Sequence, residues 1–320
     1  MRCCLGFTVL SVLTVSQLPA AEPPLAFAPA AEAGWFAFDT GELRGKLRLD
    51  GKLQGVPEMV HAASGQEITY GGGHVGLLSH YRVFSTDARY GQAARDWPSE
   101  AKLSSDGAVE VRFPPGDDHP LEMTAVYRWT APDTLDLETI AKPLVDMPDF
   151  EVFLSNYFAE GFTVSVYLQP PRFAKAEPPA FVAAEFSPLM DGNYLMFPRD
   201  REAARILFDR RWEHPPSPVQ WSVNRYMAAP LAMRRHDPSG VTALLMAPPE
   251  DCFAVATPYE RTPPDRIANH RSLYLSLFGR DVRAGEAARA CTRLVVRKGL
   301  SDEEAVELYR DYVEKLEAGR

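Results

Sequence analysis

The residues with the greatest potential for chemistry lie between Gly76 and Pro98. Read as a strand, the first part of this stretch alternates its side chains between two faces. His80 and Arg82 are then expected on the same face, beneath a loop that carries Arg89, Tyr90, Arg95 and Trp97. An unpaired buried arginine costs several kcal/mol, so this face is not expected to be a closed core. It is either a solvated face or the floor of a polar site.

Two later segments repeat this combination of polar and aromatic side chains. In residues 270–278 the leucines face one way, and the opposite face carries His270, Ser272, Tyr274 and Ser276. In residues 221–227, Asn224 and Tyr226 share a face, and Trp212 precedes them in a Pro-rich loop.

Aromatic side chains together with His, Arg and Asn are typical of a sugar site. Flat rings cover the apolar face of a pyranose, while Arg and amide groups bind its hydroxyls. An antiparallel sheet with one wet face shows the same alternation without any function. Three such segments favour a groove, and the candidate substrate-binding residues are Arg82, Tyr90, Trp97, Trp212, Asn224, Tyr226 and Tyr274. We expect His80, Arg82 and His270 in one concave pocket with at least one of Trp97, Trp212 or Tyr226.

The elements that must position these residues are almost all strands. From Trp35 onward, about sixteen short β-type runs are separated by turn residues, and one of these runs is Ala204 to Phe208. Tight turns are expected at residues 105–107, 131–133 and 236–240. The strands do not alternate with helices and show no blade-length repeat, which argues against a parallel α/β sheet and a propeller. We predict a mainly β chain, a single large antiparallel β-sandwich domain over residues 34–320.

One helix is expected at residues 301–317. Ser301 and Glu304 form a capping box, and Gly319 provides a stop. An apolar stripe at helical spacing runs along it, formed by Ala305, Leu308, Tyr309, Tyr312, Val313 and Leu316. The stripe predicts that the helix covers one sheet surface.

The start of the chain predicts export. Arg2 precedes an apolar run from Leu5 to Val15, and small residues follow at Ala20 and Ala21. This is the layout of a secretory signal peptide over residues 1–21, since a run of about 11 residues is too short for a membrane anchor, which needs roughly 20. An Ala- and Pro-rich linker is expected at 22–33. No later segment is apolar enough to span a bilayer, so we expect a periplasmic or extracellular protein without stable membrane insertion.

Export leaves Cys252 and Cys291 as an even pair in an oxidising compartment. The sequence leaves two alternatives: the two cysteines form one disulfide, or both are reduced and buried. The net charge of −9 means that the chain as a whole lacks the positive charge typical of nucleic-acid-binding proteins. Asp117-Asp118-His119 is more typical of an exposed loop than of a metal site, so neither a metal nor another cofactor is expected.

These segments resemble the galactose mutarotase-like superfamily, which includes the aldose 1-epimerases. The resemblance rests on His80-Tyr81-Arg82 and on residues 270–294, a strand, turn and strand similar to the closing hairpin of such domains. It covers most of the chain in pattern and identifies no specific member. It implies a β-supersandwich. Aldose 1-epimerases use a His acid and a Glu base, so it also implies His80 or His270 as the acid and Glu185 or Glu260 as the base.

The sequence thus predicts an exported protein that acts on or binds a sugar or polysaccharide in a groove on a sheet face. Epimerisation, elimination and hydrolysis are all open, as is a non-catalytic sugar-binding or envelope scaffold protein of the same fold. A His and a carboxylate converging in one deep pocket would indicate an enzyme. A shallow aromatic strip would indicate a binding protein.

Overall fold

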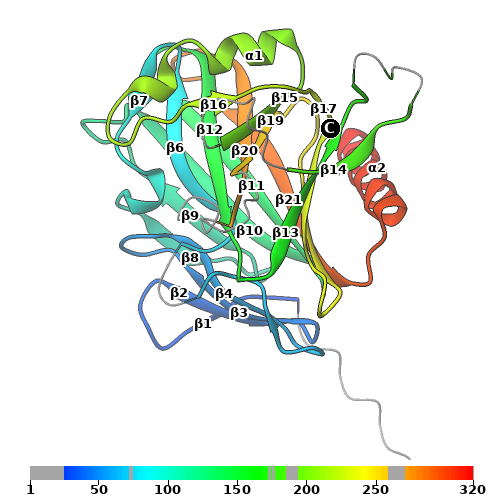
Figure 1. The fold of residues 1–320 in the computed structure, drawn as a ribbon. Coiled ribbons are helices and arrows are strands. Elements are labelled where there is room, and N and C mark those ends of the chain that lie inside the picture. The colour runs from blue at the N-terminus through cyan, green and yellow to red at the C-terminus, as the bar shows by residue number, and fades with distance from the viewer. Residues whose placement is uncertain are drawn as a thin grey trace, which may run out of the picture.

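Antiparallel strands form most of the computed structural model, which describes residues 25–71, 75–171, 174, 177–184, 194–258 and 271–319 (Figure 1). In these ranges the strands form three sheets. The five-stranded sheet has the order β1 (Ala28–Pro29), β2 (Trp35–Asp39), β3 (Leu43–Arg48), β4 (Gly55–His61) and β5 (Gln66–Glu67).

The two larger sheets pack face to face. The nine-stranded sheet has the order β14 (Ala180–Ala183), β13 (Phe162–Leu168), β17 (Met227–His236), β18 (Val241–Met246), β21 (Ala288–Lys298), β11 (Thr134–Pro143), β10 (Leu121–Ala131), β9 (Val109–Phe113) and β8 (Glu100–Leu103). The seven-stranded sheet has the order β16 (Trp221–Ser222), β15 (Tyr194–Pro198), β19 (Cys252–Pro258), β20 (Ser272–Val282), β12 (Met147–Tyr157), β6 (Ser79–Ser85) and β7 (Ala88–Tyr90). This architecture confirms the predicted mainly β, antiparallel sandwich.

Local turn chemistry sets the hairpins. The expected turns separate β8 from β9, β10 from β11 and β17 from β18. Strand β10 shows the alternation that a strand with one buried face requires, since Met123, Ala125, Tyr127 and Trp129 are buried and the residues between them are partly exposed.

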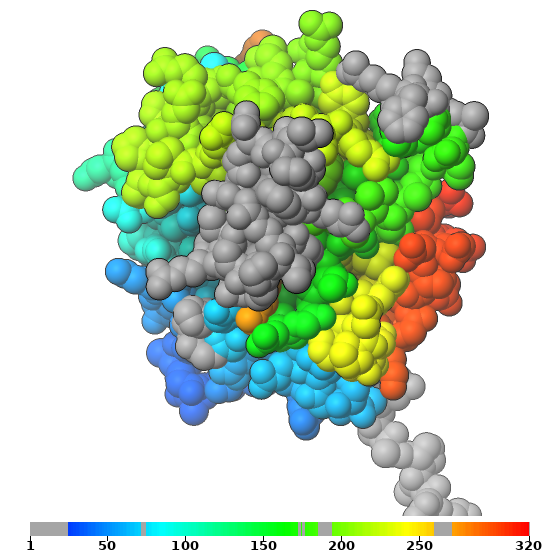
Figure 2. All heavy atoms as spheres, viewed as in Figure 1, coloured from blue at the N-terminus to red at the C-terminus, as the bar shows by residue number. Residues whose placement is uncertain are grey.

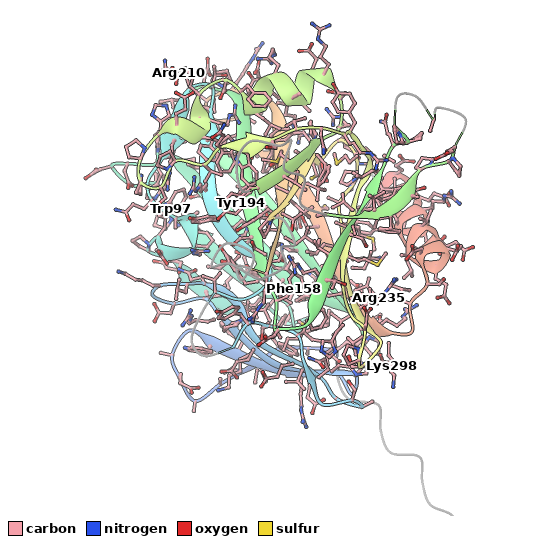
Figure 3. All side chains as sticks on the ribbon, in the orientation of Figure 1. Trp97, Phe158, Tyr194, Arg210, Arg235 and Lys298 are labelled. Atoms are coloured by element: carbon pink, nitrogen blue, oxygen red, sulfur yellow. The ribbon has the colours of Figure 1, made fainter. Side chains whose placement is uncertain are left out.

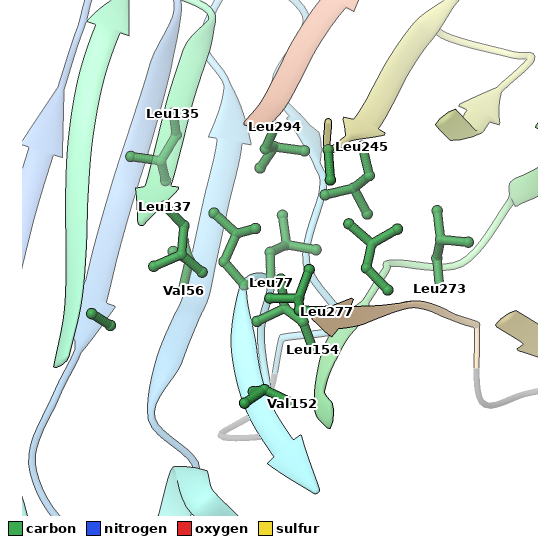
Figure 4. Packing of buried hydrophobic residues seen from close by; sticks show 14 of the residues in the cluster. Val56, Leu77, Leu135, Leu137, Val152, Leu154, Leu245, Leu273, Leu277 and Leu294 are labelled. Atoms are coloured by element: carbon green, nitrogen blue, oxygen red, sulfur yellow. The ribbon is translucent and has the colours of Figure 1, made fainter. Parts of the chain in front are cut away.

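The main core lies between the two larger sheets. Leu154 and Leu277 from the seven-stranded sheet lie in one cluster with Leu137, Leu245 and Leu294 from the nine-stranded sheet (Figure 4). The five-stranded sheet packs against one end of this sandwich (Figure 1), where the rings of Phe38 and Trp129 are 4.8 Å apart. Each sheet therefore contributes to the same buried cluster.

Each outer face of the sandwich has its own cover. Helix α2 (Asp302–Gly319) lies on the nine-stranded sheet and buries Tyr309 and Tyr312 against Leu231 and Val295 (Figure 1). The predicted capping box is present, because Ser301 N donates to Glu304 Oε2 at 2.8 Å and Glu304 N donates to Ser301 Oγ at 3.2 Å. The seven-stranded sheet is covered by residues 199–220, called here the covering segment. No helix in the described ranges is both long enough and apolar enough to cross a membrane.

The covering segment corrects one prediction. Residues 204–208, expected as a strand, belong to helix α1 (Arg201–Leu207) and its C-cap. Asp200 caps the helix by accepting from Ala203 N at 2.8 Å, and Arg, Glu and Ala are strong helix formers. The apolar residues Ile206 and Leu207 are compatible with a strand and with a helix, and the Asp200 cap favours the helix.

The expected linker at 22–33 is also wrong in part. Phe27 is only 3% exposed and lies in the main core, and the next two residues form β1, which pairs with β2. Residues in this stretch are therefore part of the fold from Phe27 onward.

Candidate binding face on the seven-stranded sheet

A β-bulge at Tyr81 organises the start of the candidate site. In the pairing of β6 with β12, Arg82 lies opposite Phe153 and His80 lies opposite the next residue, Leu154. Tyr81 is the extra residue, and a bulge of this kind shifts the alternation by one position. The prediction that His80 and Arg82 share a face is therefore wrong.

His80 points into the main core. It is 2% exposed, its Nε2 lies 2.9 Å from Thr139 Oγ1, and its ring centroid lies 6.1 Å from that of Phe113. Burial lowers the pKa of His80 to about 4. Proposed above as a catalytic acid, His80 is instead a neutral core residue between the two large sheets.

Arg82 points to the outer face of the seven-stranded sheet. It is only 3% exposed. Its Nη2 donates to Ser217 O at 2.9 Å, and its Cζ lies 4.9 Å from the Tyr81 ring centroid and 5.2 Å from that of Trp212. Its Nε and Nη1 have no hydrogen-bond partner among the described residues.

Two further arginines surround Tyr81. Arg95, from the 3₁₀ helix η1 (Ala94–Asp96), has its Cζ 4.3 Å from the Tyr81 ring centroid and 5.9 Å from that of Tyr157. Arg89 donates to the carbonyls of Pro216 and Gln92. We call Arg82, Arg89 and Arg95 the arginine cluster.

The arginine cluster changes the acidity of Arg89 and of Tyr81. Burial and the charge of Arg82 lower the pKa of Arg89 to about 10. Burial acts to raise the pKa of Tyr81, but Arg82, Arg95 and Arg89 outweigh it and lower that pKa from its ordinary value. The electrostatic field at this end of the face therefore favours negative charge.

An aromatic cluster lies next to the arginines. Phe153 stacks on Tyr274 with ring centroids 4.7 Å apart, Trp212 and Trp221 are 5.0 Å apart, and Tyr157 is 6.1 Å from Tyr274. Phe153, Trp212, Trp221 and Tyr274 are buried, whereas Tyr157 and Tyr194 are partly exposed. Tyr157 and Tyr194 pack against the buried rings and keep part of their surface outside the cluster; Tyr194 is labelled in Figure 3.

A buried ion pair holds the covering segment on the sheet. Arg211, in the 3₁₀ helix η2 (Arg211–Glu213), is fully buried; it donates to Glu151 Oε2 at 2.9 Å, to Asp209 Oδ2 at 2.8 Å and to Asp149 O at 3.0 Å. Burial raises the pKa of Glu151, and Arg211 counteracts that shift. Figure 2 shows this segment in yellow-green over the upper part of the molecule.

Two pockets flank residues 221–226. One of about 630 Å³ lies between the covering segment and β16 and is lined by Leu207, Phe208, Arg210, Trp212, Glu213, Pro218, Val219, Gln220 and Trp221. The other, of about 530 Å³, is lined by Gln169, Pro170, Pro171, Val223, Asn224, Arg225 and Tyr226. The predicted residues Asn224 and Tyr226 thus line the second pocket, whereas Trp212 belongs to the first.

Tyr90 and Trp97 do not form the predicted wall. Tyr90 packs against the main core, and its hydroxyl lies 2.7 Å from Ser85 Oγ. Trp97 (Figure 3) is 5% exposed and stacks on His119 with centroids 3.8 Å apart. Both fill space beside the face. Three predicted site residues, His270, Glu185 and Glu260, lie outside the described residues.

Sequence reasoning missed Tyr81 and Tyr157 as face residues. Tyr157 could have been found, because Phe153, Ser155 and Tyr157 alternate outward on β12 in the same way as Tyr274 on β20. Tyr81 could not, since its direction follows from the bulge.

The described cysteines and acidic residues form neither a disulfide nor a metal site. Cys252 and Cys291 are thiols, which is the reduced alternative. Cys252 is fully buried, and burial raises its pKa to about 12. In the described ranges, no group of three or more His, Cys, Asp or Glu side chains could hold a metal ion.

Comparison with known proteins gives similarity in fold alone. No family model and no curated protein matches the chain. Among solved structures, the Slr1438 protein of Synechocystis sp. PCC 6803 is 15% identical, with 90% of this chain and 100% of that chain covered and a TM-score of 0.51. The ligand-free α-N-acetylgalactosaminidase NagBb of Bifidobacterium bifidum is 11% identical, with a TM-score of 0.51 over 87% of this chain and 38% of that one.

A galactose mutarotase related enzyme from Lactobacillus acidophilus is also matched, at 9% identity and a TM-score of 0.49, with 84% of this chain and 99% of that chain covered. The likeness to Slr1438 and NagBb is one of fold, and it identifies no specific family for this chain.

Proposed function

We propose that this chain is an exported carbohydrate-active protein that holds a sugar or polysaccharide on the outer face of the seven-stranded sheet. The observation that carries the proposal is the contact between the arginine and aromatic clusters on one sheet face. Arg95 joins them, because its guanidinium lies over Tyr81 and near Tyr157.

This face combines the two kinds of contact that sugars need. The partly exposed rings of Tyr157 and Tyr194 offer flat apolar surface to the C–H face of a pyranose, and their hydroxyls add hydrogen bonds at the rim. Arg82 and Arg95 supply fixed N–H donors for sugar oxygens. A purely structural cluster gives no reason for a buried arginine of which two nitrogens have no partner among the described residues.

The fold neighbours support the same class of ligand. The matched NagBb enzyme is an α-N-acetylgalactosaminidase, and it is matched also in its complex with GalNAc, with a TM-score of 0.50. That enzyme's activity is its own, and the likeness contributes a fold able to present a sugar site.

One observation favours the non-catalytic alternative, a sugar-binding or envelope scaffold protein. General acid–base catalysis needs a titratable pair within reach of one substrate. Among the described residues, the acidic side chains closest to the aromatic cluster are Glu151 and Asp209, which are buried or nearly so and are both bound to Arg211. The candidate acid and bases His270, Glu185 and Glu260 lie outside the described residues, so a catalytic role for them stays a proposal.

Calorimetry against a sugar panel, preceded by a glycan array, tests the binding proposal. Wild type should bind at least one glycan, and Tyr157→Ala should weaken that binding by about tenfold, the scale of one lost aromatic contact. Leu144→Ala, at a residue 59% exposed and outside both clusters, serves as the control and should bind as wild type does. A wild-type protein that binds no glycan would remove the proposal.

Export has its own test. Mass spectrometry of protein recovered from the cell envelope should find an N-terminus near Ala21 or Glu22. Full-length protein retained in the cytoplasm would contradict it.

A further inference from the structure

We infer that the face takes an acidic saccharide, with the carboxylate of a uronate residue seated against Arg82 and Arg95. This inference rests on the proposed function and names the class of ligand.

The first argument is charge. Three guanidinium groups gather around Tyr81, and no carboxylate of the described residues lies within ion-pair distance of any of them. Arg211, on the same face, is a buried arginine that serves structure, and it has Glu151 and Asp209 as partners. Among the described residues the arginine cluster has no such partner, and it therefore suits an anion from outside.

The second argument is hydrogen bonding. An arginine has five N–H donors in a rigid fork. The protein acceptors for Arg82 are Ser217 O at 2.9 Å and, more weakly, the Tyr81 hydroxyl at 3.4 Å, both reached from Nη2. The Nε of Arg82, the Nη1 of Arg82 and the Nε of Arg95 have no described partner. A carboxylate, which accepts two parallel N–H bonds from one guanidinium, fits such an edge.

The third argument is the spacing of charge and rings. A uronate carries its carboxylate directly on the pyranose ring, so both groups must be bound within the length of one sugar. Arg95 lies 4.3 Å from the Tyr81 centroid and 5.9 Å from that of Tyr157, and Tyr157 contacts Tyr274 through the two hydroxyls at 3.4 Å. Charge and ring surface therefore adjoin at the distance that a single uronate requires.

Selectivity follows from the same geometry. A neutral sugar would leave the buried charge of Arg82 without compensation, whereas a uronate supplies it. We therefore expect affinity for an acidic oligosaccharide to exceed that for its neutral form by about tenfold or more, and to fall as salt is added.

The experiment compares oligogalacturonate with its methyl ester, in which the carboxylate charge is removed. Wild type should bind the acid about tenfold more tightly or better. Arg95→Gln should remove that difference while its unfolding curve matches wild type. Arg82→Lys keeps the positive charge at residue 82 but loses the two parallel N–H donors of the guanidinium. It therefore tests whether Arg82 binds the carboxylate through both donors. Arg283→Gln, at an exposed arginine in the β20–β21 turn, is the matched control and should retain the preference.

The outcomes separate this inference from the proposed function. Binding of no sugar at all would overturn both. Equal binding of acid and ester, unchanged in Arg95→Gln, would overturn the acidic-saccharide inference and leave sugar binding standing. Oligosaccharides of a sulfated galactan, which lack carboxylates, form a further arm. Binding to these alone would overturn the assignment to uronates in favour of sulfate esters.

Discussion

His80 and Arg82 lie on opposite faces of the seven-stranded sheet, although a single residue separates them, because Tyr81 is bulged out of the β6–β12 ladder. His80 meets Thr139 in the core, and Arg82 meets Ser217 and Trp212 on the outer side. One short strand thus supplies a packing residue to the sandwich and a charged residue to the candidate binding face.

The buried His80 should make stability depend on pH. The pKa of His80 is lowered to about 4 in the folded protein, against about 6.5 when unfolded. As the pH falls below 6.5 the unfolded state takes up a proton first, so stability is fully present above that pH and is lost toward pH 4. The loss amounts to about 3 kcal/mol.

Urea unfolding of wild type and of a double variant, His80→Leu with Thr139→Val, checks this. The double variant removes both hydrogen-bond partners, so no polar group is left unsatisfied. Its free energy of unfolding should fall less than that of wild type between about pH 7 and pH 4.5. If the free energy of unfolding changes with pH equally in the two proteins, His80 is not protonated preferentially in the unfolded state.

The Arg211 ion pair should dominate the stability of the covering segment. Arg211→Met leaves Glu151 buried without its partner, and such a change costs about 3–5 kcal/mol. Adding Glu151→Leu to this variant should recover part of the loss. Arg205→Met removes a half-exposed arginine that pairs with Asp149; it is the control and should cost less than about 1 kcal/mol. Equal losses for Arg211→Met and Arg205→Met would refute the anchoring role.

Tyr81 should ionise more readily than an ordinary tyrosine. Its pKa is lowered by the arginine cluster, whereas burial raises the pKa of Tyr127. In an ultraviolet titration, one phenol should ionise below about pH 10, the ordinary value. That step should be missing in Tyr81→Phe, shifted upward in Arg95→Gln and unchanged in Tyr127→Phe. An early step that persists in Tyr81→Phe would assign it elsewhere.

Cys252 should resist alkylation in the folded protein. Burial raises the pKa of its thiol to about 12, and the thiolate is the reactive form. Peptide mapping after iodoacetamide treatment should find Cys252 modified only after unfolding, with the partly exposed Cys291 modified sooner. A peptide pair joined through Cys252 and Cys291 in unreduced protein would contradict the thiol state.

Features that depend on local sequence could be predicted. The turn at 131–133 and the Ser301–Glu304 box each depend on a few adjacent residues, and both are present. The alternation predicted for residues 272–277 is also present, since Leu273, Leu275 and Leu277 lie in the main core while Tyr274 lies on the outer face. In such segments, local propensity and the alternation of side chains are enough to predict the structure.

Features that depend on distant pairing could not be predicted. The bulge at Tyr81 exists in the register between β6 and β12, which are far apart in sequence, so the alternation of β6 alone gave the wrong face for His80. Trp97 is an aromatic residue of the type that binds sugars, yet its stacking on His119 is visible only in three dimensions. Of the predicted contact residues, Arg82, Trp212 and Tyr274 do lie on the outer face.

The strand order of the seven-stranded sheet has a kinetic consequence. Its strand β12 pairs with β6 on one side and with β20 on the other, so Arg82, Phe153 and Ser276 become neighbours only after long stretches of chain have closed into loops. Loop closure over such separations is entropically costly before any contact repays it, and chains dominated by such pairings fold in about milliseconds to seconds. The arginine and aromatic clusters therefore form late, and a chain that has completed only its local hairpins, such as β10–β11, does not yet have the binding face.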